Sequence, residues 1–296
     1  MTTRSEGSVR ANGVNFRYIE QGAGRLMLCL HGFPDHAWTW RNQLDAFSTA
    51  GFRVVAPFMR GYAPTGLAPD GRYQGAVLGH DVIALIDALG DGNSAREPAI
   101  VVGHDWGAMA AYAAAVIAPS KIGRLVTLSV PYGPALGRAM IGNPLQQRRS
   151  WYIYLFLMKL ADAALPHDDF ALVDRLWREW SPEWSVPPDY MAELKRTFRS
   201  DGVANAALAY YRQAFVRELQ DPALAPLQAR IGKQAIAVPA LYLHGANDGC
   251  IGAEVALGME SLFAAGLETI VIPAAGHFVH LEKPEAVNEA IGRFVG

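Results

Sequence analysis

The feature that most constrains the fold is a glycine-flanked segment, G-H-D-W-G, at residues 103–107. It follows an apolar run at residues 98–102, typical of a buried strand, and precedes an alanine-rich stretch at residues 108–115, typical of a helix. A sharp strand-to-helix turn needs small residues around its apex, and one glycine stands two residues to either side of Asp105. This spacing is that of the nucleophile elbow G-x-S-x-G, with Asp in the position of Ser.

Strand-like and helix-like segments alternate through the first part of the chain. Asn12-Gly13 inside residues 8–21 predicts a two-stranded antiparallel hairpin. Further strands are expected at residues 26–30, 53–57, 98–102 and 124–130, with helices at 38–50, 76–89 and 108–115. The alternation predicts a mostly parallel sheet with helices on both faces.

The alternation stops at Pro131. Up to about Val238 the sequence gives no convincing strand, only helical stretches at residues 144–165, 168–180, 188–200 and 203–219. A strand at 240–245, a helix near 254–265, a strand at 268–272 and a helix at 284–294 are then expected. We therefore expect a core formed by residues 1–131 and 237–296, with a helical cap at residues 132–236 inserted in it.

The composition of the chain argues against several classes of binding partner. The 296-residue chain is 51% hydrophobic and has a net charge of −2, so neither disorder nor a basic nucleic-acid surface is expected. No apolar run reaches 18 residues, and the first residues lack an apolar signal region, so no membrane association is expected. The two cysteines belong to no CxxC or His-Cys cluster, which argues against a disulfide or zinc site. The expected location is a reducing cytoplasm.

Three polar residues follow predicted strands and could meet at one edge of the sheet. They are Asp105, Asp248 and His277. In parallel α/β folds ligands lie beyond the carboxyl ends of the strands. The order nucleophile, acid, histidine is that of α/β-hydrolases. The sequence therefore predicts a catalytic triad formed by these residues.

Several motifs together resemble a known family. They are H-G-F-P at residues 31–34 with Trp38 and Trp40 after it, G-H-D-W-G at 103–107, G-H-F at 276–278, S-W-Y at 150–152 and Y-Y-R at 210–212. With these motifs the chain resembles, over nearly its whole length, an α/β-hydrolase with an Asp nucleophile, and most closely the soluble epoxide hydrolases. The resemblance implies the α/β-hydrolase fold, a mostly parallel eight-stranded sheet flanked by helices with an inserted helical cap.

An Asp at the elbow favours a particular chemistry. A serine attacking an sp³ carbon would leave an ether, whereas a carboxylate leaves an ester that water can hydrolyse. The carboxylate needs no base for its own attack, because its reference pKa is near 3.9. His277, held by Asp248, is then available to activate water. The residues therefore indicate attack on an electrophilic alkyl carbon.

The family pattern assigns the remaining roles. It implies that the backbone N–H groups of Phe33 and Trp106 bind the oxyanion, and that Tyr152 and Tyr211 protonate the epoxide oxygen. Tyr154 and Tyr210 are the alternatives for that pair. The expected activity is hydrolysis of an epoxide to a vicinal diol.

Substrate contacts and partners are less constrained. Trp38 and Trp151 are candidates to line an apolar substrate pocket, although aromatic residues at such positions can equally pack the cap against the sheet. The expected partners are a small apolar epoxide and water. No metal or organic cofactor is expected, and both a monomer and a homodimer remain open.

Two other functions fit part of the sequence. Haloalkane dehalogenases share the Asp-His-acid chemistry and the Trp after the nucleophile, but that family commonly has Asn where this chain has Phe33. Phe33 and the two cap tyrosines favour the epoxide. A non-catalytic ligand receptor on the same fold is the second alternative, and the intact triad argues against it.

Overall fold

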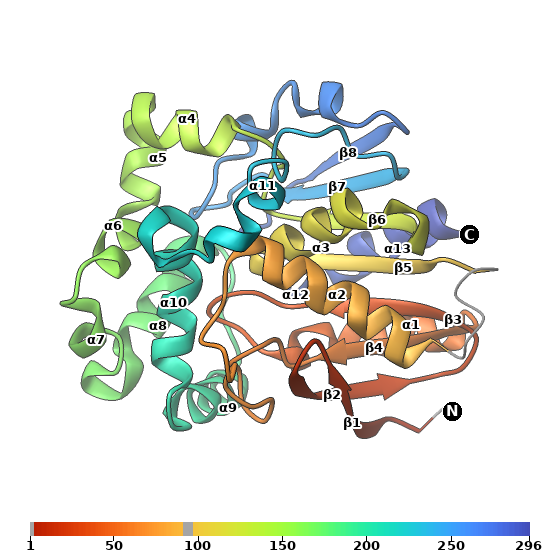
Figure 1. The fold of residues 1–296 in the computed structure, drawn as a ribbon, viewed down its shortest axis with the longest axis horizontal. Helices are drawn as coiled ribbons and strands as arrows, with labels where there is room; N and C mark the ends of the chain where they lie inside the picture. The colour runs from red at the N-terminus through yellow and green to blue at the C-terminus, as the bar shows by residue number, and fades with distance from the viewer. Residues whose placement is uncertain (1–2, 91–96) are drawn as a thin grey trace.

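The computed structural model describes residues 3–90 and 97–296. Eight strands form one sheet in the order β1-β2-β4-β3-β5-β6-β7-β8 (Figure 1). The strands are β1 (Ser5–Ala11), β2 (Val14–Gln21), β3 (Arg25–Leu30), β4 (Phe52–Pro57), β5 (Ala99–His104), β6 (Ile122–Leu128), β7 (Ala240–Gly245) and β8 (Leu267–Ile272). β2 pairs antiparallel with both β1 and β4, and the other pairs are parallel. The predicted hairpin and mostly parallel sheet are confirmed.

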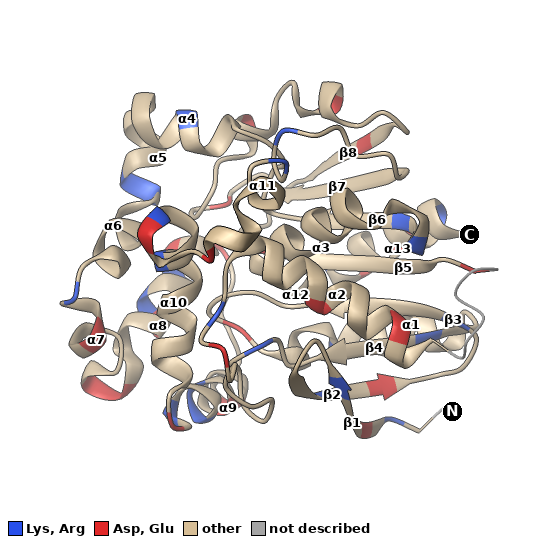
Figure 2. Cartoon of the chain, in the orientation of Figure 1, with Lys and Arg blue, Asp and Glu red and all other residues tan. Residues whose placement is uncertain are grey.

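The sheet separates two hydrophobic cores, because successive side chains of a strand point to opposite faces. In β5, Val101 packs in the core that contains α2 (Gly75–Leu89) and α3 (Trp106–Ile117). Its neighbours Ile100 and Val102 pack in the other core, with α1 (Arg41–Thr49) and α13 (Pro284–Val295). Strands β5 and β7 carry no Lys, Arg, Asp or Glu (Figure 2). The apolar run that identified β5 is thus buried on both faces, as in other parallel sheets.

The segment between β6 and β7 is fully described and contains helices but no named strand. The helices, which we call the cap helices below, are α4 (Ala135–Gly142), α5 (Pro144–Arg149), α6 (Trp151–Leu157), α7 (Ala161–Ala164), α8 (His167–Trp180), α9 (Pro188–Arg199), α10 (Val203–Phe215) and α11 (Ala225–Gln228). Figure 1 shows most of them gathered at one end of the strands. Among the described residues, no helix is both long and apolar enough to span a bilayer.

Some predicted helices differ from the observed ones. The helix expected at 254–265 is wrong: two 3₁₀ turns, Ala253–Ala256 and Met259–Leu262, lie there instead. Gly258 between them has φ +80°, a left-handed conformation that ends a helix. The helix expected at 38–50 begins with a 3₁₀ turn, Ala37–Trp40, and only α1 is regular. The stretch at 144–165 is divided into α5, α6 and α7.

Candidate active site

Asp105 lies at the sharp turn between β5 and α3. Its φ of 53° and ψ of −120° are strained for a residue with a side chain. The flanking glycines are required by close packing: a Cβ on Gly103 would collide with the backbone of Gly107, and a Cβ on Gly107 with the carbonyl of Leu30. The elbow therefore holds Asp105 in one fixed orientation at the carboxyl end of a central strand.

The loop after β3 approaches the Asp105 side chain. The backbone N–H of Phe33 donates a hydrogen bond to Asp105 Oδ1 at 2.7 Å. A Cβ on Gly32 would collide with the Asp105 side chain and would lie 2.6 Å from the backbone nitrogen of Trp106. Gly32 thus leaves room for Asp105 and for the N–H groups of Phe33 and Trp106 to lie together. This is the arrangement that an oxyanion hole needs.

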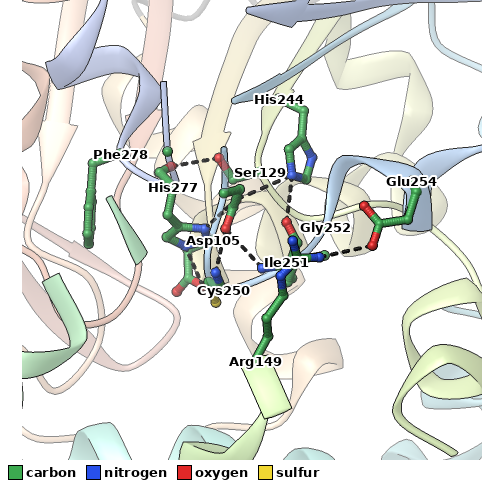
Figure 3. Close-up of polar contacts among 12 residues, drawn as sticks. Asp105, Ser129, Arg149, His244, Cys250, Ile251, Gly252, Glu254, His277 and Phe278 are labelled. Atoms are coloured by element: carbon green, nitrogen blue, oxygen red, sulfur yellow. Dashed lines mark hydrogen bonds and ion pairs between the residues drawn. The ribbon is translucent and has the colours of Figure 1, made fainter. Parts of the chain in front are cut away.

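Asp248 and His277 complete the constellation, and Figure 3 shows His277 beside Asp105. The His277 ring lies between two carboxylates: Nδ1 donates to Asp248 Oδ2 at 2.9 Å, and Nε2 lies 3.5 Å from Asp105 Oδ2. Asp248 Oδ1 accepts hydrogen bonds from the backbone N–H groups of Cys250 and Ile251, at 2.7 and 2.9 Å. The three residues predicted from separate strand ends therefore meet.

The charges of this group are strongly coupled. Burial alone would lower the pKa of His277, but the Asp248 and Asp105 carboxylates raise it to about 10. Burial would conversely raise the pKa of Asp105, yet its contact with His277 holds that pKa below the ordinary value. The pKa of Asp248 is also lowered, against the effect of burial, by the charge of His277 and by hydrogen bonding. Asp105 is therefore ionised at neutral pH and able to act as a nucleophile.

A cavity of about 100 Å³ opens in front of Asp105. Its walls come from α3, from cap helices α4, α6 and α10, and from the loop after β7. The lining residues are Asp105, Trp106, Met109, Val130, Leu136, Tyr152, Ile153, Tyr211, Ala214, Phe215 and Ile251. Most of these side chains are apolar, so the cavity suits an apolar ligand that contacts the Asp105 carboxylate.

Tyr152 and Tyr211 both line this cavity and are almost completely buried. The Tyr152 hydroxyl lies 3.3 Å from Cys250 Sγ. The Tyr211 hydroxyl meets no described residue in good hydrogen-bond geometry, although the Trp106 indole is close enough to affect its pKa. Burial raises the pKa of both tyrosines, so both phenols keep their protons at neutral pH. Two protonated phenols thus share the cavity with Asp105.

The alternative tyrosines lie elsewhere. The Tyr210 hydroxyl donates to the carbonyl of Arg60 at 2.8 Å. Tyr154 is 44% exposed, and its hydroxyl donates to the carbonyl of Met140 at 3.2 Å. Neither residue lines the cavity at Asp105. Of the four tyrosines, Tyr152 and Tyr211 are therefore the two that share a cavity with Asp105.

The two candidate substrate-binding tryptophans are not brought to the cavity. The guanidinium carbon of Arg4 lies over the Trp38 ring, 5.4 Å from the ring centre, near the N-terminal strand. Trp151 donates from Nε1 to Glu179 at 3.0 Å and stacks with Arg175 on an outer part of the cap. Trp151 precedes Tyr152 on α6, and successive residues of a helix point about 100° apart. Trp151 therefore points from a different side of α6 than Tyr152, toward Glu179 and Arg175.

Several supporting residues gave no distinctive sequence signal. The backbone carbonyl of His277 accepts from Ser129 Oγ at 2.7 Å and from His104 Nε2 at 2.9 Å, which fixes the loop that carries His277. His104 was visible only as a residue of the elbow, and Ser129 only as the end of a strand. Among the described residues, Asp248, Cys250 and His277 each offer an atom that could bind a metal ion, and these atoms lie within 4.8 Å of one another. Nδ1 of His277 is, however, already hydrogen-bonded to Asp248.

Comparisons with known proteins place the chain in a family. A family model described as alpha/beta hydrolase fold matches residues 25–284. An epoxide hydrolase of Caballeronia sordidicola is 30% identical, over 98% of this chain and 93% of that protein, and epoxide hydrolase 3 of Xenopus tropicalis is 29% identical, over 97% and 76%. The crystal structure of a Bacillus megaterium epoxide hydrolase with an inhibitor has a TM-score of 0.82 at 27% identity, over 98% of this chain and 99% of that one. The chain belongs to the epoxide hydrolase family of the α/β-hydrolase fold.

Proposed function

We propose that this protein hydrolyses epoxides to vicinal diols through a covalent ester on Asp105. One observation carries the proposal: Asp105 and the two buried phenols Tyr152 and Tyr211 line the same small cavity. A carboxylate there can attack a ring carbon while a phenol protonates the ring oxygen. Residues 132–236 act in this proposal as the cap that supplies the phenols.

The first step alkylates the enzyme. An Asp105 carboxylate oxygen attacks one epoxide carbon, the bond from that carbon to the ring oxygen breaks, and the oxygen takes the proton of Tyr152 or Tyr211. An unprotonated alkoxide would be a far stronger base than the phenolate that replaces it, so the proton transfer lowers the barrier. The Phe33 N–H bond to Oδ1 keeps the carboxylate oriented for this attack.

The second step hydrolyses the ester. Formation of the ester removes the negative charge of Asp105, one of the two charges that raise the pKa of His277. That pKa then falls, and His277 loses its proton, which passes to the phenolate left by the first step and restores the phenol. The neutral imidazole can then act as a base toward water. The water gives one proton to His277 and attacks the ester carbonyl, and the N–H groups of Phe33 and Trp106 stabilise the oxyanion. When the oxyanion collapses, the bond from the carbonyl carbon to the alkyl oxygen breaks, that oxygen takes the second proton of the water, and the diol leaves Asp105 as a carboxylate. Asp248 orients His277 through Nδ1 throughout.

The cavity limits the substrate class. Its volume of about 100 Å³ is small beside the several hundred Å³ of most ligand pockets. Apart from Asp105 and the two phenols, the walls are hydrophobic or aromatic side chains. A small apolar epoxide is the substrate that these walls favour.

Phenylalanine substitutions of the cap tyrosines test the choice of leaving group. Tyr152→Phe and Tyr211→Phe are each expected to lower the rate of diol formation about 10²-fold, because each removes a proton donor. Tyr154→Phe is the matched control and should keep its rate, since its hydroxyl lies on the outer surface of the cap. The measurement is diol formation from a panel of small epoxides.

The same variants distinguish epoxide hydrolysis from haloalkane dehalogenation. The Trp106 indole also lines the cavity and could donate to a leaving halide, which needs no proton. We expect diol from epoxides, and no halide from chloro- and bromoalkanes of matched size. Halide release that is unaffected by Tyr152→Phe, without diol formation, would make the protein a dehalogenase. If neither diol nor halide were formed, a non-catalytic receptor would be favoured.

A further inference from the structure

Cys250 contacts three parts of the site, although the mechanism above gives its thiol no role. Its Sγ lies 3.3 Å from the Tyr152 hydroxyl, and its backbone N–H donates to Asp248 Oδ1 at 2.7 Å. Its carbonyl accepts from Gln146 Nε2 at 2.9 Å. Cys250 therefore connects the acid of the triad to a proposed proton donor and to cap helix α5.

The position of the thiol is fixed by its surroundings. The fully buried Gln146 side chain binds the Cys250 carbonyl with Nε2 and accepts from the Gly252 N–H with Oε1, at 3.1 Å. Beside it, Arg149 at the end of α5 pairs with Glu254 at 2.9 Å (Figure 3). These contacts clamp the loop after β7 onto the cap, so the backbone that carries the thiol cannot move away from Tyr152 without breaking buried hydrogen bonds.

The direction of the Tyr152 proton matters for the alkylation step. A phenol has one proton, and it protonates the substrate only if it points into the cavity. If the thiol donates its hydrogen to the phenol oxygen, the phenol proton remains available to the epoxide. Burial raises the pKa of the Cys250 thiol well above its ordinary value, so the thiol keeps the hydrogen that it would donate.

We propose that Cys250 is a positioning residue for alkylation, whose thiol donates to the Tyr152 oxygen and leaves the phenol proton turned toward the cavity. The inference rests on the proposed function. As Asp105 attacks, the carbon–oxygen bond of the ring breaks and the ring oxygen takes the phenol proton. The phenolate oxygen that results keeps the S–H group as a hydrogen-bond donor, and the thiol itself is unchanged.

The test compares Cys250→Ala and Cys250→Ser in single-turnover experiments with a reactive epoxide, followed by rapid-quench mass spectrometry of the intact protein. Ester formation should be about tenfold slower in Cys250→Ala, the order of one lost hydrogen bond. Cys250→Ser should restore most of the rate, because a hydroxyl can donate in the same place. Ester hydrolysis should stay unchanged in both, since the backbone N–H to Asp248 remains.

Cys29→Ala is the matched control for this substitution. Cys29 is equally buried but lies in β3, in the core on the opposite face of the sheet from α3. The Cys29→Ala variant should form the ester as fast as the unchanged protein. Thermal unfolding should verify that every variant is folded. Ester formation in Cys250→Ala that is as fast as in the unchanged protein, or faster, overturns the positioning role alone. If the unchanged protein forms no ester, the proposed function fails as well.

Discussion

Replacing Asp105 by asparagine is expected to lower kcat/KM for epoxide hydrolysis by about 10⁴-fold, in the range seen when a nucleophile is removed. The amide has nearly the shape of the carboxylate, and its oxygen can still accept the hydrogen bond from the Phe33 N–H. It lacks the negative charge that attacks the ring carbon. The measurement is diol formation together with the mass of the intact protein, which should show no adduct.

The control for this variant is Asp201→Asn, at an exposed position just before α10. It makes the same chemical change far from the elbow and should leave the rate unchanged. If Asp105→Asn kept more than about a tenth of the activity, the carboxylate would not be the nucleophile, and a mechanism in which water attacks the epoxide directly would replace the one proposed here.

Replacing His277 by glutamine is expected to separate the two steps. Alkylation should continue, because Asp105 needs no base for its attack, but hydrolysis of the ester should fall by about 10³- to 10⁴-fold. The protein should then accumulate a stoichiometric adduct whose added mass equals that of the epoxide. Peptide mapping by mass spectrometry should place the adduct on Asp105.

His167→Gln serves as the control, since His167 is exposed at the start of α8. It should turn over at the normal rate and carry no adduct. A His277→Gln protein that turned over normally would remove His277 from the role of base. A protein that neither turned over nor accumulated an adduct would show that His277 is needed for alkylation itself.

The elements that local patterns determine could be predicted from the sequence. The elbow at Asp105 was recognisable because two glycines at fixed spacing and a buried strand leave few alternatives. Asp248 and His277 could be predicted because each follows an apolar strand, and parallel strands place their carboxyl ends together. The sheet itself followed from the alternation of strands and helices.

Features that depend on packing across the sequence could not be predicted in the same way. The helical pattern alone does not distinguish Tyr152, which faces the cavity, from Trp151, which contacts Arg175 on the outside, and only the family resemblance singled out Tyr152. The direction of each side chain depends on how α6 rotates against α10 and the core. The clamp of Gln146 on Cys250 joins residues 104 positions apart, and neither belongs to a recognisable motif.

The regular helix expected after β7 was wrong for a related reason. A run rich in alanine and leucine favours a helix, but Gly258 adopts a left-handed conformation and divides the segment into two short turns. The local preference for helix is a few tenths of a kcal/mol per residue and is readily overridden by packing.

The covalent ester on Asp105 is the central claim, and a single turnover in H₂¹⁸O tests it most directly. With enzyme in excess over a small epoxide, water attacks the ester carbonyl, so the label should enter the Asp105 carboxylate and the diol should remain unlabelled. Mass spectrometry of the diol and of the peptide that contains Asp105 measures both. Label in the diol after the first turnover, with none in Asp105, would contradict the account.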